Sequence, residues 1–466
     1  MPKATANGGM RQMLAIALPM VVSQGCDTVM IFSGRLFLSK LGPDYMNAVM
    51  AGGLTVFMLM SFFVGLISYA TALVAQYLGA GLKKNCELVV TQGVLLSIAV
   101  FVPLLALRPL IHHWFASSGI ASAQLGPQIV YFDILFFSVI LTLIKCCFVS
   151  FFSGIGRTGV VMTASLAAMT VNILSSFVLI FGRFGVPAMG IRGAALGTIL
   201  GALAGLAVLL KAYLDKRLRL EFDFKKSLKF DAGTMKKLLY FGSPTGLELF
   251  LNIFAFNTMV MIFHSHSPVT ATAATILFNW DLVSFVPLLG IEIGVTSMVG
   301  RYMGARDPDS ANRSVLSGLK MALIYSSGIL LLFIGATHGL VWMFAPDHLS
   351  VVFYKAAPLA MFMVRLAALY VMTDALLVVF IGALRGAGDT YWAMAISVSL
   401  HWLTVTVLFI SLRMLKLTPQ QSWAAVVSIF VICSFFAWLR YRTGKWRAIR
   451  VIDQGPPVLA DEIPQG

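Results

Sequence analysis

The chain has 466 residues, of which 59% are hydrophobic and 11% are charged, and its mean hydropathy is +0.89. Soluble domains carry about 25% charged residues, so this composition excludes a soluble enzyme, a disordered chain and a secreted disulfide-rich domain. The net charge of +15 would suggest nucleic-acid binding in a soluble protein, whereas in a membrane protein it reflects basic cytoplasmic loops. We therefore expect a polytopic membrane protein that binds no nucleic acid.

Apolar segments long enough to cross a bilayer recur along the whole chain. A membrane helix needs about 20 apolar residues, and continuously apolar runs predict helices rather than the alternating strands of a barrel. We predict an all-α fold with twelve transmembrane helices, six in each half. The segments cover residues 11–34, 46–75, 88–108, 127–152, 159–182, 190–214, 238–263, 269–299, 314–337, 355–382, 389–412 and 418–440.

The basic residues divide unequally between the two sets of connecting segments. With the N-terminus inside, the inner segments hold 24 basic residues and the outer segments hold 8, so the positive-inside rule places both termini in the cytoplasm. One long connection alternates apolar and basic residues, which is typical of a segment lying on the membrane surface. We predict an N-terminal bundle, this linker, a C-terminal bundle and a cytoplasmic tail at residues 1–214, 215–237, 238–440 and 441–466.

The five cysteines form no CxxC or Cys/His pattern, so we expect neither a metal site nor a disulfide framework. The second half of the chain repeats the first at a shift of 225 residues. Residues 74–80 (VAQYLGA) are echoed by residues 299–305 (VGRYMGA), and Pro19 is echoed by Pro244. Six spans are an even number, so the two bundles are parallel repeats related by a pseudo-two-fold axis along the membrane normal. Such bundles enclose a central cavity and give alternating access by rocking.

These motifs resemble those of the multidrug and toxic compound extrusion (MATE) transporters, and the NorM-like branch fits best. Residues 74–81 resemble the block after the second helix of that family, and residues 242–248 (GSPTGLE) resemble the start of its seventh helix. Three further stretches agree, at residues 17–24, 179–198 and 383–390.

The resemblance implies an antiporter rather than an enzyme. Such a protein exports small organic cations and amphiphilic drugs in exchange for H⁺ or Na⁺, and we favour H⁺. It needs no cofactor besides the coupling ion. We expect a monomer in the inner or plasma membrane.

Ionisable residues inside a membrane are costly, and they are therefore the first candidates for function. The predicted spans hold two basic residues, Lys145 and Arg365, and a larger number of acids. This acidic interior suits a cavity for cations and a proton relay. The six acids are Asp27, Asp133, Glu248, Asp281, Glu292 and Asp374.

Asp374 is the first candidate, with Tyr370 one turn before it on the same helix face. In the NorM-like pattern, an acid at this position takes part in ion or proton coupling and a tyrosine stands one turn before it. The alternative is a structural pair with Arg365, which nine intervening positions on one helix disfavour.

Three more coupling candidates follow from the resemblance. The family's acid in the seventh helix falls at Asn252, and Glu248, one turn earlier, is expected to take over its role. Asp27 is the counterpart of Asn252 in the first repeat, while Gly34 stands where the family often has an acid. Asn172 matches a polar family site in the fifth helix. The alternative for each is a polar contact between helices or with water.

Asp281 and Glu292 lie eleven residues apart, close to three helical turns, so they share a face. If that face lines the cavity, the two acids favour cationic substrates. Asn279 and Ser176 are the other predicted cavity residues, and Ser176 stands where some family branches have an acid. The alternative for Asp281 is a partner in Asn279 or a neighbouring helix.

Two other functions were compared with export. A lipid-linked precursor flippase of the same superfamily would carry extra helices and a basic cavity, unlike this chain. An intramembrane aspartyl protease is suggested by residues 386–389 (GAGD). That chemistry needs two carboxylates sharing a proton, and the partner motif is absent.

Overall fold

The computed structural model describes residues 8–41, 43–117, 122–222, 229–345 and 351–452. These residues contain twelve helices long and apolar enough to cross a membrane, which confirms the predicted fold class. In the first half they are α1 (Met10–Ser39), α2 (Pro43–Ser68) with α3 (Ala70–Gly79), α4 (Lys83–Ser117), α5 (Ser122–Gly154), α6 (Thr158–Phe181) and α7 (Ile191–Tyr213).

In the second half they are α9 (Ala232–His264), α10 (Pro268–Gly304), α11 (Pro308–Gly335), α13 (Val351–Ala387), α14 (Thr390–Phe409) and α15 (Pro419–Arg442). A π-helical turn, η2 (Ile410–Met414), continues α14. The short elements are α8 (Lys216–Phe222), α12 (Thr337–Trp342) and the 3-10 turn η3 (Lys445–Ala448).

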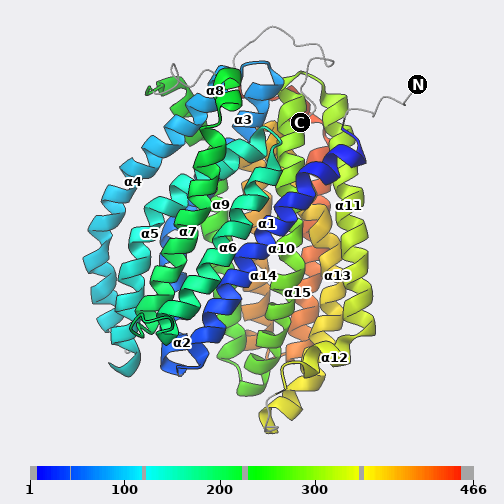
Figure 1. Ribbon diagram of the computed structural model, residues 1–466. Coiled ribbons are helices and arrows are strands. Elements are labelled where there is room, and N and C mark those ends of the chain that lie inside the picture. The colour runs from blue at the N-terminus through cyan, green and yellow to red at the C-terminus, as the bar shows by residue number, and fades with distance from the viewer. Residues whose placement is uncertain (1–7, 42, 118–121, 223–228, 346–350, 453–466) are drawn as a thin grey trace.

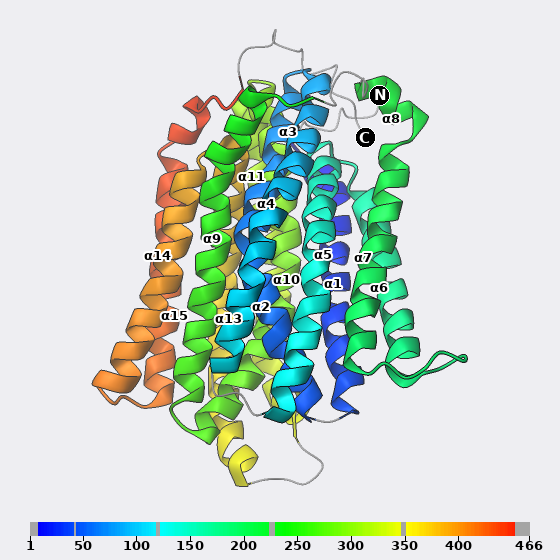
Figure 2. The same cartoon turned by 90° about the vertical axis from the view of Figure 1, so that its left-hand side faces the viewer.

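The two halves lie side by side. In Figure 2, α9, α14 and α15 are on one side and α5, α6 and α7 on the other, with α2 and α10 between them. The start of α1 and the end of α15 meet the same part of the bundle, since Tyr302 donates to Gln12 at 2.8 Å and Tyr441 donates to Asn312 at 2.6 Å. Both ends of the helical array therefore lie at one end of the molecule, the upper one in Figure 1.

Glycines of the repeated motif bring the two halves into backbone contact. A Cβ on Gly79 would overlap the carbonyl oxygen of Arg301, and a Cβ on Gly304 would overlap that of Gln76. Both residues of the first contact are shifted by 225 relative to their counterparts in the second. The same contact is thus made twice, once from each repeat.

A second pair of contacts follows the same rule. Gly65 packs against the backbone of Gly246, and Gly290 packs against the backbone of Val21, again with a shift of 225 residues between counterparts. Small residues allow such close approach of helices within a membrane. The predicted pseudo-symmetric pairing of the repeats is confirmed by these reciprocal contacts.

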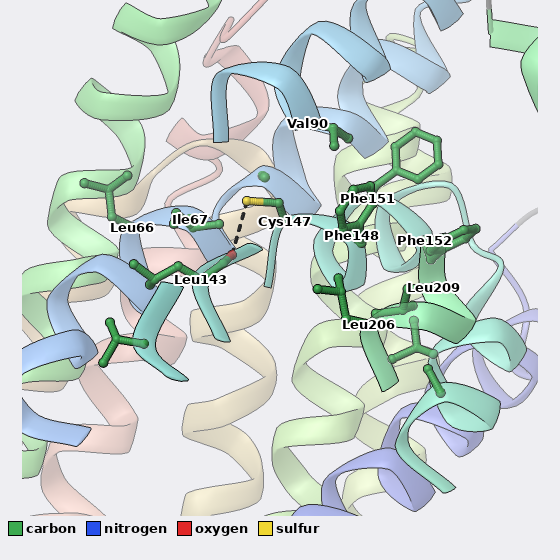
Figure 3. Packing of buried hydrophobic residues seen from close by; sticks show 14 of the residues in the cluster. Leu66, Ile67, Val90, Leu143, Cys147, Phe148, Phe151, Phe152, Leu206 and Leu209 are labelled. Carbon is green, nitrogen blue, oxygen red and sulfur yellow. Dashed lines mark hydrogen bonds between the residues drawn. The ribbon is translucent and has the colours of Figure 1, made fainter. Parts of the chain in front are cut away.

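The core of the first half is built around α5. Figure 3 shows Phe148 and Phe151 of α5 among the cluster that also holds Leu209 of α7. Cys147 lies in the same cluster and donates to the carbonyl of Leu143 at 3.3 Å. These buried side chains fix α5 and α7 as the interior helices of that half.

The connection between the halves contains α8, whose Leu218 and Phe222 are buried while Leu220 is 86% exposed. α9 begins at Ala232, before the predicted start at 238, because Asp231 caps it by accepting from the Thr234 amide at 2.7 Å. Residues 223–228 of the predicted linker and 453–466 of the predicted tail lie outside the described residues. The boundaries of the four predicted segments stay a prediction.

Candidate ion and substrate site

Close packing of α10 against α13 places acidic side chains between the helices of the second half. Gly382 and Gly386 lie four residues apart on α13, and each faces the backbone of α10, at Glu292 and Thr296 respectively. The Thr296 hydroxyl donates to the Gly382 carbonyl at 3.0 Å. A side chain larger than hydrogen at either glycine would push the helices apart, so this pair of glycines sets the position of Glu292.

Arg385 of α13 holds two carboxylates from two other helices. Its Nη2 donates to Glu248 Oε2 of α9 at 3.1 Å, and its Nη1 forms an ion pair with Glu292 Oε1 of α10. The side chains of Glu248, Glu292 and Arg385 are 6%, 10% and 19% exposed. One guanidinium thus balances two buried carboxylates, and its Nε has no hydrogen-bond partner among the described residues.

A second group of side chains lies nearer the middle of α13. The Tyr370 hydroxyl donates to Asp281 Oδ1 of α10. Tyr370 is held by Phe430 and Trp423, with ring centroids 5.0 and 6.1 Å away. Asp374, one turn further along α13, is 8% exposed and lies within electrostatic reach of Asp281 and Glu292.

The structure therefore brings together five predicted site residues: Glu248, Asp281, Glu292, Tyr370 and Asp374. We call these five and Arg385 the acidic seam. The alternative partner of Asp374 is elsewhere, since Arg365 donates to Thr337 of α12 at 3.4 Å. The seam carries four carboxylates against one guanidinium, so it is an environment for a cation.

Asn252 extends the seam toward α14. Its Nδ2 donates to the Ser397 hydroxyl at 2.8 Å, and the Ser397 carbonyl contacts His401 Nδ1 at 2.8 Å. Asn252 Oδ1 is buried and has no hydrogen-bond partner among the residues described. Buried polar atoms are nearly always hydrogen-bonded, so this oxygen is available to a donor from a bound molecule.

Four predicted site residues lie apart from the seam. Asp27 Oδ1 of α1 lies 3.9 Å from Lys145 Nζ of α5, and the Asp27 side chain is 45% exposed. Asn279 is exposed and donates to the carbonyl of Thr275 on its own helix at 2.8 Å.

The other two, Asn172 and Ser176, are buried between α6 and α7. Asn172 Nδ2 lies 3.5 Å from the Thr198 hydroxyl, and Ser176 faces Gly197. A role in the cavity for these two residues is not supported by their position and remains a prediction.

Arg385 is the seam residue that the sequence analysis missed. The predicted span ends at 382, which assigns Arg385 to a cytoplasmic turn, whereas α13 continues to Ala387. A signal was nonetheless present, because Arg385 follows Asp374 by eleven residues and so lies on the same helix face.

The remaining charged groups of the spans have partners of their own. Asp133 Oδ1 lies 2.7 Å from both Arg108 and His112 between α4 and α5. Asp389, the acid of the GAGD stretch, pairs with Arg440 at 2.8 Å; burial raises the pKa of Asp389, and the Arg440 guanidinium opposes this. Asp389 is thus engaged with a cation. The described residues contain no group of three or more His, Cys, Asp or Glu suited to a metal ion.

Comparison with known proteins places this arrangement in a family. Among curated relatives, the "Probable multidrug resistance protein NorM" of Thermotoga maritima is 25% identical over 97% of this chain and 96% of its own length. The protein of the same name from Shewanella oneidensis is 26% identical over 84% of each chain. The "Multidrug resistance protein MdtK" of Yersinia pseudotuberculosis is 25% identical over 84% of this chain and 85% of its own.

Solved structures share the fold. A MATE protein in complex with MaL6 superimposes with a TM-score of 0.86 at 17% identity, covering 96% of this chain and 98% of its own. A MOP superfamily transporter from Pyrococcus furiosus gives a TM-score of 0.85 at 18% identity, covering 95% and 97%. The MatE family model matches residues 19–178 and 244–410, one segment in each repeat and together well over half of the chain. The chain therefore belongs to the MatE family, the MATE transporters that its motifs resemble.

Proposed function

We propose that this transporter is a multidrug efflux antiporter that exports organic cations and amphiphilic drugs in exchange for H⁺, with Na⁺ as the alternative coupling ion. The observation that carries the proposal is the acidic seam, with four buried carboxylates and one guanidinium on α9, α10 and α13. The names of the relatives, which refer to multidrug resistance, support the same assignment.

The two parts of the seam take different roles in the proposed cycle. Arg385 neutralises most of the charge of Glu248 and Glu292, whereas Asp281 and Asp374 retain theirs and are free to bind a cation. A cationic drug then binds from the cytoplasm when the aspartates are ionised. Protons that arrive from outside neutralise the aspartates and release the drug. One charge moving through 100 mV supplies about 2.3 kcal/mol to this exchange.

The surrounding protein supports a rocker-type alternating-access mechanism. The repeats meet through the reciprocal glycine contacts of Gly79 and Gly304, which form a continuous seam about which one half can tilt against the other. The distribution of basic residues supports cytoplasmic termini in a plasma membrane. We expect a monomer to suffice, because all the seam residues belong to one half. A flippase for anionic lipid-linked precursors is disfavoured by the excess of carboxylates in the seam.

Transport of ethidium in proteoliposomes tests the proposal, with a pH gradient and a Na⁺ gradient imposed separately. We expect the pH gradient to drive uptake of the cation and Asp374→Asn to abolish it. The control is Asp133→Asn, which removes a carboxylate of α5 far from the seam and should retain transport. Unchanged pH-driven transport in Asp374→Asn would remove the seam from the mechanism, and transport driven by Na⁺ alone would change the coupling ion.

A further inference from the structure

The larger cavity of the described residues lies outside the acidic seam, on the side of the second half. It has a volume of about 1120 Å³ and runs between α11, α13 and α15. Its walls are mainly apolar, with Leu316 of α11, Phe380 of α13 and Val431 and Phe435 of α15 among them. Leu316, Val431 and Phe435 are about half-exposed within membrane-spanning helices, so this groove opens sideways to the lipid.

Aromatic side chains close one end of the groove in a fixed arrangement. Tyr441 stacks on Trp446 with centroids 5.2 Å apart and packs on Phe380 at 5.1 Å, while its hydroxyl donates to Asn312. The Trp446 indole in turn donates to the Tyr441 carbonyl at 2.9 Å. Gly444 has a φ of +68°, a left-handed conformation that reverses the chain after α15 and folds η3 back over the groove.

Two arginines stand at this closed end. The Arg442 guanidinium lies 4.9 Å from the ring of Trp438, and that of Arg447 lies 5.4 Å from the ring of Trp446. Arg447 also lies 3.6 Å from Asp309, whose side chain is 83% exposed. No carboxylate within the described ranges pairs with Arg442. The end of the groove therefore carries a net positive charge.

The position of this charge relative to the membrane indicates its ligand. Arg442 is the last residue of a membrane-spanning helix, so it marks the boundary between the apolar core and the surface. Tryptophan and tyrosine are typical of that boundary, and basic residues there attract anionic lipid headgroups. A cationic drug would meet two arginines at this end, unlike in the acidic seam.

We propose that the groove binds one anionic phospholipid, with its phosphate at Arg442 and Arg447 and an acyl chain along α11, α13 and α15. The lipid comes from the leaflet in which α15 ends, the cytoplasmic one in the orientation proposed above. The site uses no residue of the acidic seam, so it stands whether or not the transport proposal holds.

Native mass spectrometry of the full chain in detergent tests the proposal with dioleoyl-phosphatidylglycerol and, as the neutral comparison, dioleoyl-phosphatidylcholine. We expect phosphatidylglycerol to bind more tightly, and Arg442→Gln with Arg447→Gln to weaken its binding about tenfold. The matched control is Arg217→Gln with Arg219→Gln, which removes two exposed arginines from α8 at the same end of the molecule and should leave binding unchanged.

A second variant tests the groove without touching its charge. Leu316→Trp fills the apolar part and should weaken phosphatidylglycerol binding, whereas Leu331→Trp, at an exposed position of α11 outside the groove, should not. Equal loss in the two arginine pairs would show a general charge effect and overturn the proposal. Equal binding of both lipids, or displacement of phosphatidylglycerol by ethidium, would also overturn it.

Discussion

The two repeats share a backbone framework but differ in the chemistry that they carry. At the repeat shift of 225 residues, Glu248, Asp281 and Glu292 correspond to Ser23, Val56 and Ile67, and at the shift of 228 found further on, Asp374 corresponds to Cys146. In the first repeat, Ser23 bonds to Ser165 at 2.6 Å and Cys146 contacts the Val64 carbonyl at 3.8 Å. Duplication thus kept the glycines that join the halves, while the ionisable groups were placed in the second half alone.

Arginine at one repeated position shows the difference most clearly. Arg157 and Arg385 are counterparts at the 228-residue shift. Arg157 pairs with Glu221 of α8 at 3.2 Å, and its side chain is 44% exposed. Arg385 is buried between two carboxylates. The same residue type therefore serves a surface contact in one repeat and an interior charge balance in the other.

The shared framework is the feature whose loss should cost most. Valine at Gly79 would force its Cβ into the Arg301 carbonyl, and backbone atoms on both sides leave no room to adjust. We expect Gly79→Val to destabilise the protein by more than about 4 kcal/mol and Gly304→Val to have an equal effect, because the contact is made twice. Thermal unfolding of the purified variants, or their yield of folded protein, measures this.

Gly159→Val is the control for that experiment, since no atom outside its own helix lies within 4 Å of the added Cβ. It should retain nearly wild-type stability. A mild effect of Gly79→Val together with a severe effect of Gly304→Val would mean that the two contacts are not equivalent.

The divergent arginines should differ by several kcal/mol. Arg385→Gln leaves Glu248 and Glu292 buried without a counter-ion, and removing one partner of a buried ion pair costs about 3–5 kcal/mol. Arg157→Gln breaks an exposed pair worth about 0–1 kcal/mol. The free energy of unfolding of the two variants, compared at neutral pH, measures the difference.

Adding Glu292→Gln to Arg385→Gln removes one of the stranded charges and should recover part of the lost stability. Equal losses in Arg157→Gln and Arg385→Gln would show that Arg385 does not balance the seam in the folded protein.

Features set by local composition could be predicted from the sequence, and features set by packing could not. The twelve spans follow from hydropathy, and the pairing of Tyr370 with Asp374 follows from helix periodicity. The shared face of Asp281 and Glu292 also follows from spacing. In contrast, Asn172 and Ser176 face α7, and which neighbour a helix face meets depends on tertiary packing. Arg385 was missed because a span edge moved by little more than one turn takes a residue from water into the interior.

The starts of the two repeats give the smallest expected difference. The N-cap of α1 is Gly9, which offers no side-chain hydrogen bond, whereas the Asp231 carboxylate caps α9 by accepting from the Thr234 amide. Replacing an N-cap aspartate by alanine costs about 1 kcal/mol. We expect Asp231→Ala to lose about that amount at neutral pH, whereas Asp231→Asn keeps the cap and should lose little.

The pH dependence separates the cap from its charge. The side-chain and backbone hydrogen bonds from Thr234 lower the pKa of Asp231 below its ordinary value of about 3.9. A carboxyl whose pKa is lowered by folding contributes stability above that ordinary value and loses it as the pH falls through the folded value, because the unfolded chain binds the proton more tightly. Wild type should therefore lose stability relative to Asp231→Asn between about pH 5 and pH 3, as followed by thermal unfolding. If the two melting temperatures fall in parallel over that range, the carboxylate is not the group that holds the start of α9.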